Sequence, residues 1–529
     1  MDSVDGSART DSSLRSGGRR PFRRAPLGWL VLGTLLAAFP SGAGSAEQVE
    51  TKLLAADGAA GDVFGYAVSI SGTTALVGAH QDDGSAGDRG SAYVFIRSGG
   101  GWQQQAKLTP PVGTSHKNFG YAVALSGDTA LVGVELDTGD GTTTTGAYVF
   151  VRQNAAWTQQ ALLVADVPKK TNWFHVSLAL SGDTALVGAW RDETNGYLSG
   201  AAVAFVRDGT SWSEQARLLP ADGEAFDAFG FEVALSGDTA LVGALGDDDM
   251  GDFAGAAYVF ERSGSTWSQQ AKLLAGDAEP FDNFGDDVAI SGSTALVGAS
   301  REDTHGEKAG AAYVFVRNGS SWLQEAKLMA SDGEPQALFG VVAVSGDTAL
   351  VGAQHHDSVG ATDAGAVYVF TRSEGVWTEV EQLVPSDIEP FDAFGRAVSV
   401  ADGYYLAGAA DDEYGTDSGA AYVFGPQGLR LAVGAGSCPG TADLSITGAP
   451  PSSELGVVRA GSDKGFVKGG KLCGGMVMEI GEPFVLPPVW MTTDAAGNAS
   501  ASITLPADRC WLEAVALTTC ETSGAIEVD

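Results

Sequence analysis

Hydrophobic and polar positions in the middle of the chain follow a pattern that returns at a fixed interval. In one copy, Phe229–Ser236 alternates apolar residues with small or polar ones, as a half-buried strand does. The turn Ser236–Asp238 leads to a second apolar segment, Thr239–Ala244 (TALVGA). An acidic loop then precedes Gly255–Arg262, and a Ser-Gly-Ser turn precedes Trp267–Leu274. The pattern predicts four short strands joined largely by tight turns.

This four-segment unit recurs seven times, and successive copies are 55 residues apart. The phenylalanines that open the copies are Phe64, Phe119, Phe174, Phe229, Phe284, Phe339 and Phe394. A period of this length is the signature of a repeat architecture, and four antiparallel strands per repeat make one propeller blade. A β-solenoid is the alternative, but two hairpin turns per repeat favour blades. The sequence therefore predicts an all-β chain built around a seven-bladed β-propeller.

The two ends of the repeat region complement each other. The seventh copy stops at Phe424, without a tryptophan-containing fourth segment, and Gly425 and Pro426 follow. Before the first copy, Gln48–Leu54 (QVETKLL) matches the fourth segment of the other copies. We therefore expect residues 47–54 to form the outer strand of the last blade, which leaves no open sheet edge. The predicted propeller spans residues 47–425.

The recurring residues resemble the FG-GAP repeat, the unit of the head propeller of integrin α subunits. The similarity rests on the Phe-Gly pairs, on the Val-Gly-Ala of TALVGA, and on the Gly-Ala-Ala-Tyr-Val-Phe block, and it is closest to the short bacterial version of the repeat. The resemblance implies a propeller and a ligand-binding role for one face of the ring. Calcium-binding members carry an Asp-rich loop between the first and second strands, and that motif is absent from every copy.

The N-terminal segment differs from the repeats in composition. Residues 1–46 combine a basic flank, the 13-residue apolar run Leu27–Phe39 and small residues from Ser41 to Ala46. This order predicts a secretory signal peptide, with a membrane anchor as the alternative. Because a spanning helix needs ~20 apolar residues, we expect a secreted or cell-surface protein without membrane insertion after signal cleavage.

The C-terminal segment, residues 429–529, holds the four cysteines of the chain and several alternating runs. We expect a β-sandwich of about 100 residues there. Four cysteines allow three pairings, and the expected bridges are Cys438 with Cys473 and Cys510 with Cys520. The alternative is that the cysteines bind zinc, but the segment has no Cys-x-x-Cys and no histidine. Export to an oxidising environment favours disulfides.

The chain is strongly acidic, with 66 acidic residues, 31 basic residues and a formal net charge of −35. This excess argues against nucleic acid or an anionic membrane as partner. In a four-stranded blade, the loops between the second and third strands and the links between blades lie on one face of the ring. These two sets of loops contain more than half of the acids, and we call the face that carries them the loop face.

Three of the acidic loops have carboxylates spaced closely enough to bind calcium, the one cofactor that the sequence indicates. The candidate ligands are Asp82, Asp83, Asp88, Asp247, Asp249, Asp252, Asp411, Asp412 and Asp417. The alternative is structural, because aspartate also suits Gly-rich turns by accepting hydrogen bonds from nearby backbone. Diffuse counterions would then balance the charge.

Two links between blades, Thr109–Asn118 and Ala165–Trp173, break the acidic pattern. Together with the third blade's own acidic-loop position they predict a basic and aromatic patch for a ligand, formed by Lys117, Lys169, Lys170, Trp173, Trp190 and Arg191. Such residues are favoured at binding hot spots. The alternative is sequence drift in two surface loops.

Two further positions carry the same residue in six copies. We expect the tryptophans at 102, 157, 212, 267, 322 and 377 to pack between blades, and the arginines at 97, 152, 207, 262, 317 and 372 to lie at solvated strand ends. No catalytic motif is present, and the copies are too alike to indicate a catalytic site.

The sequence thus favours a secreted or cell-surface binding or adhesion protein that presents its loop face to an extracellular protein or glycan, with calcium as an assisting ion. The alternative is an extracellular propeller enzyme acting on a polysaccharide through the central funnel. That alternative requires blade-specific His, Asp or Tyr residues at the funnel.

Overall fold

The computed structural model describes residues 48–83, 89–98, 101–112, 114, 116–139, 142–165, 174–410 and 418–426, and five short segments beyond them. The predicted signal peptide lies outside the described residues. So do several predicted site residues: Asp88, Lys169, Lys170, Trp173, Asp411, Asp412, Asp417, Cys438, Cys473, Cys510 and Cys520.

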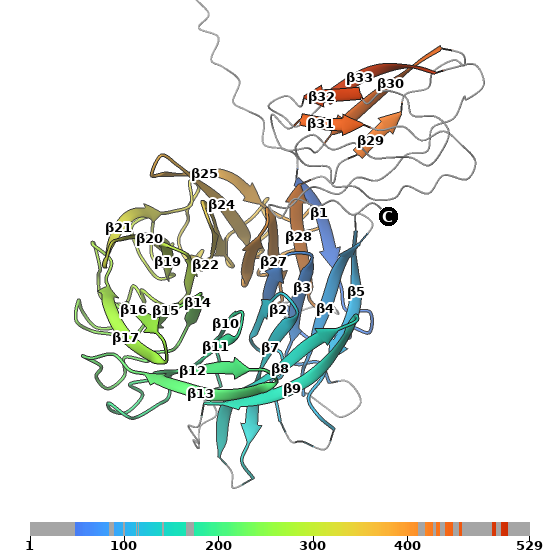
Figure 1. Ribbon diagram of the computed structural model, residues 1–529. Coiled ribbons are helices and arrows are strands. Elements are labelled where there is room, and N and C mark those ends of the chain that lie inside the picture. The colour runs from blue at the N-terminus through green and yellow to red at the C-terminus, as the bar shows by residue number, and fades with distance from the viewer. Residues whose placement is uncertain are drawn as a thin grey trace, which may run out of the picture. The chain divides into compact units, whose positions relative to one another are not determined.

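Seven four-stranded antiparallel sheets form a ring, so the fold is the predicted all-β seven-bladed propeller (Figure 1). The first blade contains β2 (Phe64–Ser71), β3 (Thr74–Ala79), β4 (Ser91–Ser98) and β5 (Gly101–Leu108). The second contains β6 (Val123–Ser126), β7 (Thr129–Asp137), β8 (Thr143–Gln153) and β9 (Ala156–Val164). The third contains β10 (Leu178–Ser181), β11 (Thr184–Ala189), β12 (Ala201–Asp208) and β13 (Ser211–Leu218).

The fourth blade contains β14 (Val233–Ser236), β15 (Thr239–Ala244), β16 (Ala256–Ser263) and β17 (Thr266–Leu273). The fifth contains β18 (Val288–Ser291), β19 (Thr294–Ala299), β20 (Ala311–Asn318) and β21 (Ser321–Leu328). The sixth contains β22 (Phe339–Ser345), β23 (Thr348–Ala353), β24 (Ala366–Ser373) and β25 (Val376–Leu383). The seventh contains β26 (Val398–Ala401), β27 (Tyr404–Ala409), β28 (Ala420–Pro426) and β1 (Gln48–Leu53). The first strands of neighbouring blades touch around the whole ring, including β26 against β2, so they form its inner wall.

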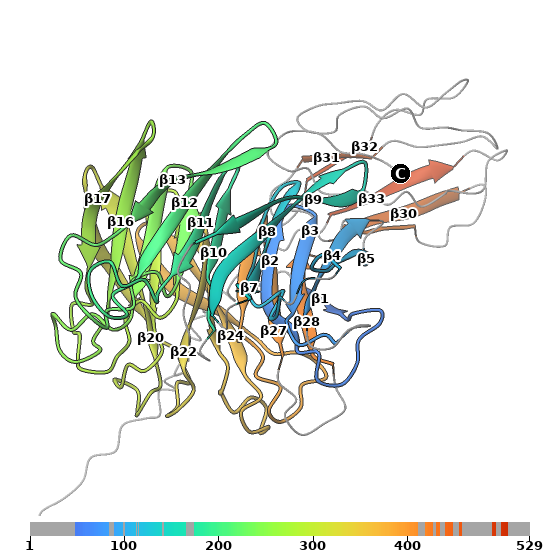
Figure 2. The ribbon, with the colours of Figure 1, turned by 90° about the horizontal axis from the view of Figure 1, so that it is seen from below.

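The N-terminal strand completes the seventh blade, as the sequence predicts. β1 pairs antiparallel with β28, from Gln48 opposite Pro426 to Leu53 opposite Ala421. Leu53 is buried in the cluster that joins the last blade to the first. Lys52 Nζ also lies 2.8 Å from a carboxylate oxygen of Asp387, in the link between the sixth and seventh blades. The ring is therefore closed by non-covalent pairing of the two ends of the repeat region. Figure 2, at right angles to Figure 1, shows the strands of the blades from the side.

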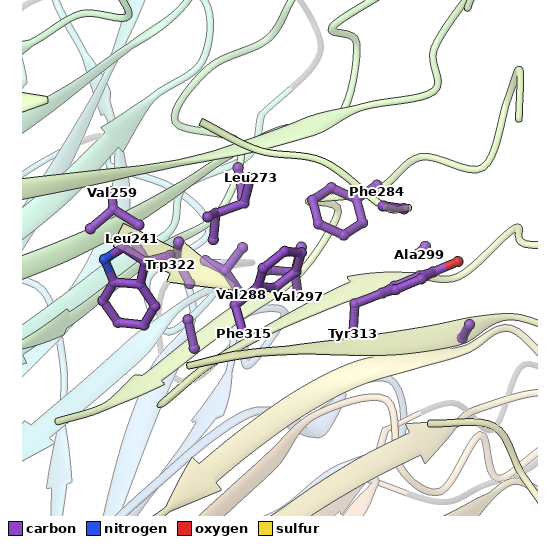
Figure 3. Packing of buried hydrophobic residues seen from close by; sticks show 14 residues of the cluster. Leu241, Val259, Leu273, Phe284, Val288, Val297, Ala299, Tyr313, Phe315 and Trp322 are labelled. Atoms are coloured by element: carbon purple, nitrogen blue, oxygen red, sulfur yellow. The ribbon is translucent and has the colours of Figure 1, made fainter. Parts of the chain in front are cut away.

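Each interface between blades buries a hydrophobic cluster. Between the fourth and fifth blades, Leu241 and Val259 belong to the same buried cluster as Phe284 and Tyr313 (Figure 3). The Phe284 ring meets the Tyr313 ring edge-on, with centroids 5.4 Å apart. A fully buried phenylalanine contributes about 1.5–3 kcal/mol of hydrophobic stabilisation. The opening phenylalanine of the repeat is therefore an anchor between blades.

The glycines of the two motifs are required by close backbone contacts. Gly230 follows the opening phenylalanine with φ of +82°, and a Cβ there would lie 2.1 Å from the carbonyl oxygen of Ala201 in the preceding blade. A Cβ on Gly243, in the Val-Gly-Ala motif, would lie 2.1 Å from the carbonyl oxygen of Gly285 in the following blade. Only glycine fits such approaches. His175, which replaces the first glycine in the third blade, is the one departure among the seven copies.

The first strand is shorter than predicted in five of the seven blades. In the fourth blade we predicted a strand from Phe229, but β14 begins at Val233. The Phe229 amide donates to the carbonyl of Ser199 in the preceding blade, at 3.0 Å, and does not join its own sheet. The Phe-Gly pair therefore connects blades before the strand starts.

The two repeated outer positions also link blades. Trp212 Nε1 donates to Gln160 Oε1 of the preceding blade at 2.9 Å, which agrees with the predicted role of the tryptophans. Our expectation of solvated arginines was wrong. Arg207 donates to Asp183 in its own blade and to Thr129 Oγ1 in the preceding one, at 2.6 and 3.0 Å, and its side chain is only 17 % exposed. The same bonds recur at Arg152 and Arg262.

Beyond the propeller, the structure describes a three-stranded sheet and a separate strand pair. The sheet is formed by β29 (Arg430–Val433), β30 (Gly440–Thr447) and β33 (Ala499–Leu505), and the pair by β31 (Glu454–Val457) and β32 (Val489–Thr492). These strands do not test the predicted sandwich, most of which falls outside the described residues. Within the described ranges, no helix has the length and hydrophobicity to cross a membrane.

Candidate functional site

A pocket of about 670 Å³ lies where the seven inner strands converge. The second residue after each opening phenylalanine lines it, and this residue varies among the copies: Tyr66, Tyr121, Val176, Phe231, Asp286, Val341 and Arg396. Residues that follow the second strands, among them Leu245, Ser300 and Gln354, also line the pocket, so it lies toward the loop face. The sequence analysis missed this site. Its signal was a variable position beside the invariant phenylalanine of the repeat.

One side of the pocket is aromatic. The rings of Tyr66 and Tyr121 lie 4.9 Å apart, and the His175 ring stacks on that of Phe231 at 4.1 Å. His175 Nε2 lies 2.8 Å from the Phe231 carbonyl oxygen, so it donates there, and Nδ1 can accept from the Tyr121 hydroxyl at 3.3 Å. The Arg396 guanidinium lies over the Tyr66 ring, 4.3 Å from its centroid. Blade-specific residues thus fix each other in this wall.

The pocket is also lined by carboxyl groups. Asp286 accepts hydrogen bonds from the Ser300 hydroxyl and, at 3.1 Å, from the Ser300 amide. Its other oxygen, Oδ1, is buried and has no hydrogen-bond partner in the described part of the chain. Burial raises the pKa of Asp286 to about 6. Such an oxygen is unusual in a folded protein, where nearly all buried polar atoms are paired.

Two further acidic residues, Asp287 and Glu232, line the pocket with Asp286. Asp287 accepts from the amides of Val288 and, in the next blade, Val342, each at 2.8 Å. Burial, followed by repulsion from Glu232, raises the pKa of Asp287 well above its usual value. Glu232 in turn accepts from the Ser177 hydroxyl at 2.5 Å and lies 3.2 Å from His175 Nε2. The crowding of carboxyl groups thus favours the protonated form of Asp287.

In the fourth blade, the calcium candidates Asp247 and Asp249 are engaged by protein groups. Asp247 is buried and accepts from the Tyr258 hydroxyl at 2.7 Å, with Lys272 Nζ also 2.7 Å away. Lys272 Nζ lies 2.5 Å from Asp249 as well. Asp252 is exposed in the same loop. A lysine thus occupies the position that a calcium ion would take between Asp247 and Asp249.

The first blade repeats this arrangement and adds a third carboxylate. Asp82 accepts from the Tyr93 hydroxyl at 2.5 Å and lies 2.6 Å from Lys107 Nζ. One carboxylate oxygen from each of Asp62, Asp82 and Asp83 lies within 4.8 Å of the other two. Asp62 was not among the predicted ligands, because it belongs to the link before the blade and only the fold brings it to Asp82. These three carboxylates can supply oxygen ligands to one cation.

The predicted basic patch is not assembled by the residues that the structure describes. Lys117 is exposed, and its backbone pairs with Glu135 at 3.0 and 2.9 Å. Arg191 is only 4 % exposed, so its charge does not lie on the surface, contrary to our prediction. Trp190 lies beside the pocket, with its ring centroid 6.2 Å from that of Phe231.

Comparison with solved structures gives a crystal structure titled a "putative 6-phosphogluconolactonase" from Bacteroides uniformis. The two chains share 13 % identity with a TM-score of 0.40, over 61 % of this chain and 86 % of the other. A likeness at this level carries no functional argument. No curated protein matches the chain significantly.

Comparison with protein families gives seven matches to the FG-GAP repeat, at residues 48–95, 102–150, 157–205, 212–260, 267–315, 322–370 and 377–424. Each match begins at an outer strand and ends in the third strand of the following blade, and the first begins at β1. The matches cover more than half of the chain, and each takes the outer strand of one blade with the first three strands of the next. The chain therefore belongs to the FG-GAP repeat family.

Proposed function

We propose that this protein is an exported binding protein that holds an extracellular protein or glycan ligand at its loop face, with the central pocket as the point of recognition. One observation carries the proposal. The residues that join blades repeat from copy to copy, whereas the seven residues at the pocket position include tyrosine, phenylalanine, valine, aspartate and arginine. A uniform scaffold around a varied lining is suited to recognition of one ligand.

The pocket also has the size and rigidity that binding requires. Its volume of about 670 Å³ lies within the range of ~300–1,000 Å³ typical of ligand pockets. The inner strands that carry the lining are fixed by interblade contacts such as the Val342 amide on Asp287. A rigid site loses little conformational entropy when a ligand binds. Export is supported by the composition of residues 1–46 and by the four cysteines near the C-terminus.

A second candidate is an extracellular enzyme that acts on a polysaccharide. The observation in its favour is Asp286, a pocket carboxyl group whose pKa burial raises to about 6, beside two further carboxyl groups. A carboxylic acid that keeps its proton near neutral pH can serve as a general acid. Reducing-sugar release from polysaccharides by the parent, and its loss in Asp286→Asn, would favour the enzyme.

The binding proposal is tested by capture of extracellular glycans and proteins on the immobilised chain. The variant Phe231→Ala removes an aromatic ring from the pocket, and Phe281→Ala removes one that is 56 % exposed on the loop face. We expect Phe231→Ala to lose most of the captured material and Phe281→Ala to retain it. If the parent chain captures nothing from any extracellular extract, the proposed function is wrong. Equal loss in both variants would mean that the loops, and not the pocket, recognise the ligand.

A further inference from the structure

We propose that the loop face carries an aromatic platform for a neutral polysaccharide. Two pairs of rings at successive junctions between blades form this platform: Tyr197 with Phe226 between the third and fourth blades, and Phe253 with Phe281 between the fourth and fifth. The inference rests on the proposed binding function and names the class of ligand. The pocket binds one part of the polysaccharide, and the platform binds a neighbouring part of the same chain.

The first support is the exposure of these rings. Tyr197 and Phe281 are each 56 % exposed, Phe226 is 53 % exposed and Phe253 is 42 % exposed. The rings of the first pair meet edge-on, with centroids 5.4 Å apart, and those of the second are nearly parallel, with centroids 6.2 Å apart. A single exposed apolar residue is ordinary, but paired rings at two successive junctions form apolar patches, which are typical of binding surfaces.

The second support is the backbone of the two phenylalanines, which stand three residues before the opening phenylalanines of their blades. Phe226 has a φ of +76° and Phe281 a φ of +74°, a left-handed conformation that is rare for bulky residues and favours glycine. The equivalent residue before the first blade is Gly61, with a φ of +87°, and a Cβ there would meet nothing within 4 Å. Glycine thus fits this turn, and the backbone gives no reason for an aromatic ring. Such strain is concentrated at functional positions.

The third support is that backbone hydrogen bonds fix both pairs and connect the second one to the pocket. In the first pair, the Phe226 amide donates to the Tyr197 carbonyl at 2.9 Å. In the second, the amide of Asn283, two residues after Phe281, donates to the Phe253 carbonyl at 3.1 Å. Asn283 also lines the central pocket, so the segments that hold this pair continue into the pocket lining. Rings that are fixed before binding lose little entropy when a ligand binds.

The charge around the rings indicates which ligand fits them. Asp222, Asp248, Asp252 and Glu279 are exposed in the same loops and links as the four rings. These carboxylates repel an anionic polymer, and they accept hydrogen bonds from hydroxyl groups. A neutral sugar unit has both matching features, because its apolar C–H face stacks on the negatively polarised face of an aromatic ring and its hydroxyl groups lie at its edge.

The recurrence of the pairs favours a ligand that also repeats. Phe226 and Phe281 are 55 residues apart and hold the same position before neighbouring blades. A polysaccharide presents the same sugar unit at regular intervals, so one chain can meet both pairs with the same chemistry. Contact with both pairs raises the affinity above that of either pair alone. A basic protein would also complement the carboxylates, and the experiment separates it from the polysaccharide.

The experiment is native affinity electrophoresis of the full chain in gels that contain a neutral polysaccharide: hydroxyethyl cellulose, xylan, a galactomannan or a β-1,3-glucan. We expect at least one of them to retard the parent. The double variant Phe226→Gly, Phe281→Gly should bind that polysaccharide about tenfold more weakly. Either substitution alone should weaken binding only about threefold, because the other pair remains. The double variant Phe226→Tyr, Phe281→Tyr keeps both rings and should bind as the parent does.

Loss of folding would not explain the expected result. Glycine is the residue that the first blade carries at this position, at Gly61 and in the same left-handed conformation. The melting temperature of the glycine double variant should therefore stay close to that of the parent while binding falls.

The matched control is Gln336→Gly, at the same position in the link to the sixth blade. Gln336 is exposed and has a φ of +70°, so this variant makes the same backbone change without removing a ring. We expect it to leave the retardation unchanged. If it weakens binding as much as the glycine double variant, the backbone and not the rings governs binding, and the inference is overturned.

Three further results would overturn the inference. No neutral polysaccharide retards the parent, or the glycine double variant is retarded as strongly as the parent, or the rings matter only for polylysine, which stands in for a basic protein. In each of these cases, a ligand captured from extracellular extract by the parent and lost in Phe231→Ala would still uphold the proposed function.

Discussion

Replacement of Asp286 by asparagine should stabilise the protein at neutral pH, although it removes a charged group from an acidic pocket. Asparagine has nearly the same shape and can still accept from Ser300, which donates both its hydroxyl and its amide to Asp286. What the substitution removes is the ionisation of a carboxyl group in a buried place. The sign of the effect follows from the pKa of this group in the folded and unfolded chains.

In the unfolded chain the Asp286 pKa is about 3.8, and burial raises it to about 6 in the folded protein. The folded state therefore holds the proton more tightly, and the free energy of unfolding falls as the pH rises between these values. Below about pH 3.8 the raised pKa has no destabilising effect, and above about pH 6 the effect is complete. A shift of about two units corresponds to about 3 kcal/mol. Since the pocket admits solvent, which screens the charge, we expect about 1–3 kcal/mol.

The measurement is thermal unfolding of the parent and of Asp286→Asn in a series of buffers from about pH 4.5 to about pH 8. The melting temperatures should differ least at the acidic end, and the variant should melt a few degrees higher at the basic end. Asp248→Asn, on an exposed loop, controls for the loss of one charge and should show no such divergence. A variant that is as stable as the parent, or less stable, above pH 7 would refute the argument that burial governs this carboxyl group.

Three further predictions concern the ring and its acidic loops. Deletion of residues 48–53 removes the pairing of β1 with β28 and the buried Leu53, and should lower the melting temperature by several degrees; an unchanged value would contradict closure by this strand. Arg207→Ala breaks the bonds to Asp183 and Thr129 and should destabilise the chain by about 1 kcal/mol in denaturant titration, whereas a solvated arginine would have no effect. Millimolar calcium should raise the melting temperature of the parent but not of Asp83→Asn. If calorimetry detects no heat of calcium binding, only diffuse counterions balance Asp62, Asp82 and Asp83.

The scaffold could be predicted from the sequence because its residues act in the same way in six of the seven copies. Phe284 packs against Tyr313 as Phe229 packs against Tyr258, with ring centroids 5.4 Å apart in both blades. A residue under the same constraint six times leaves a periodic signal. The closing strand was visible for the same reason, because its match to the fourth segment could be checked against six complete copies.

The pocket could not be predicted in this way, because its residues are the ones that do not repeat. Asp286 and Arg396 occupy equivalent positions in different blades but have opposite charges. Nothing in their local sequence shows that both face the axis, and only the ring brings them into one pocket. The repeated arginines were wrongly predicted to be solvated for a related reason. Arg207 ends a strand, which suggests solvent, but the partner that buries it, Thr129, is 78 residues earlier in the chain.

The division between repeated and variable residues has a physical basis in the geometry of the propeller. Gly243 meets the backbone of the next blade, so any side chain there would collide with a carbonyl oxygen. Phe229 is fully buried, so a smaller residue would leave a cavity between blades. Phe231, two residues further, faces the axis, where its surroundings are the pocket and the side chains of other copies. At that position a substitution changes what the pocket can bind while the contacts of the Phe-Gly and Val-Gly-Ala motifs between blades remain. The axis is thus the place where seven similar blades can supply different chemistry, and a site assembled there can acquire a new ligand while the propeller stays intact.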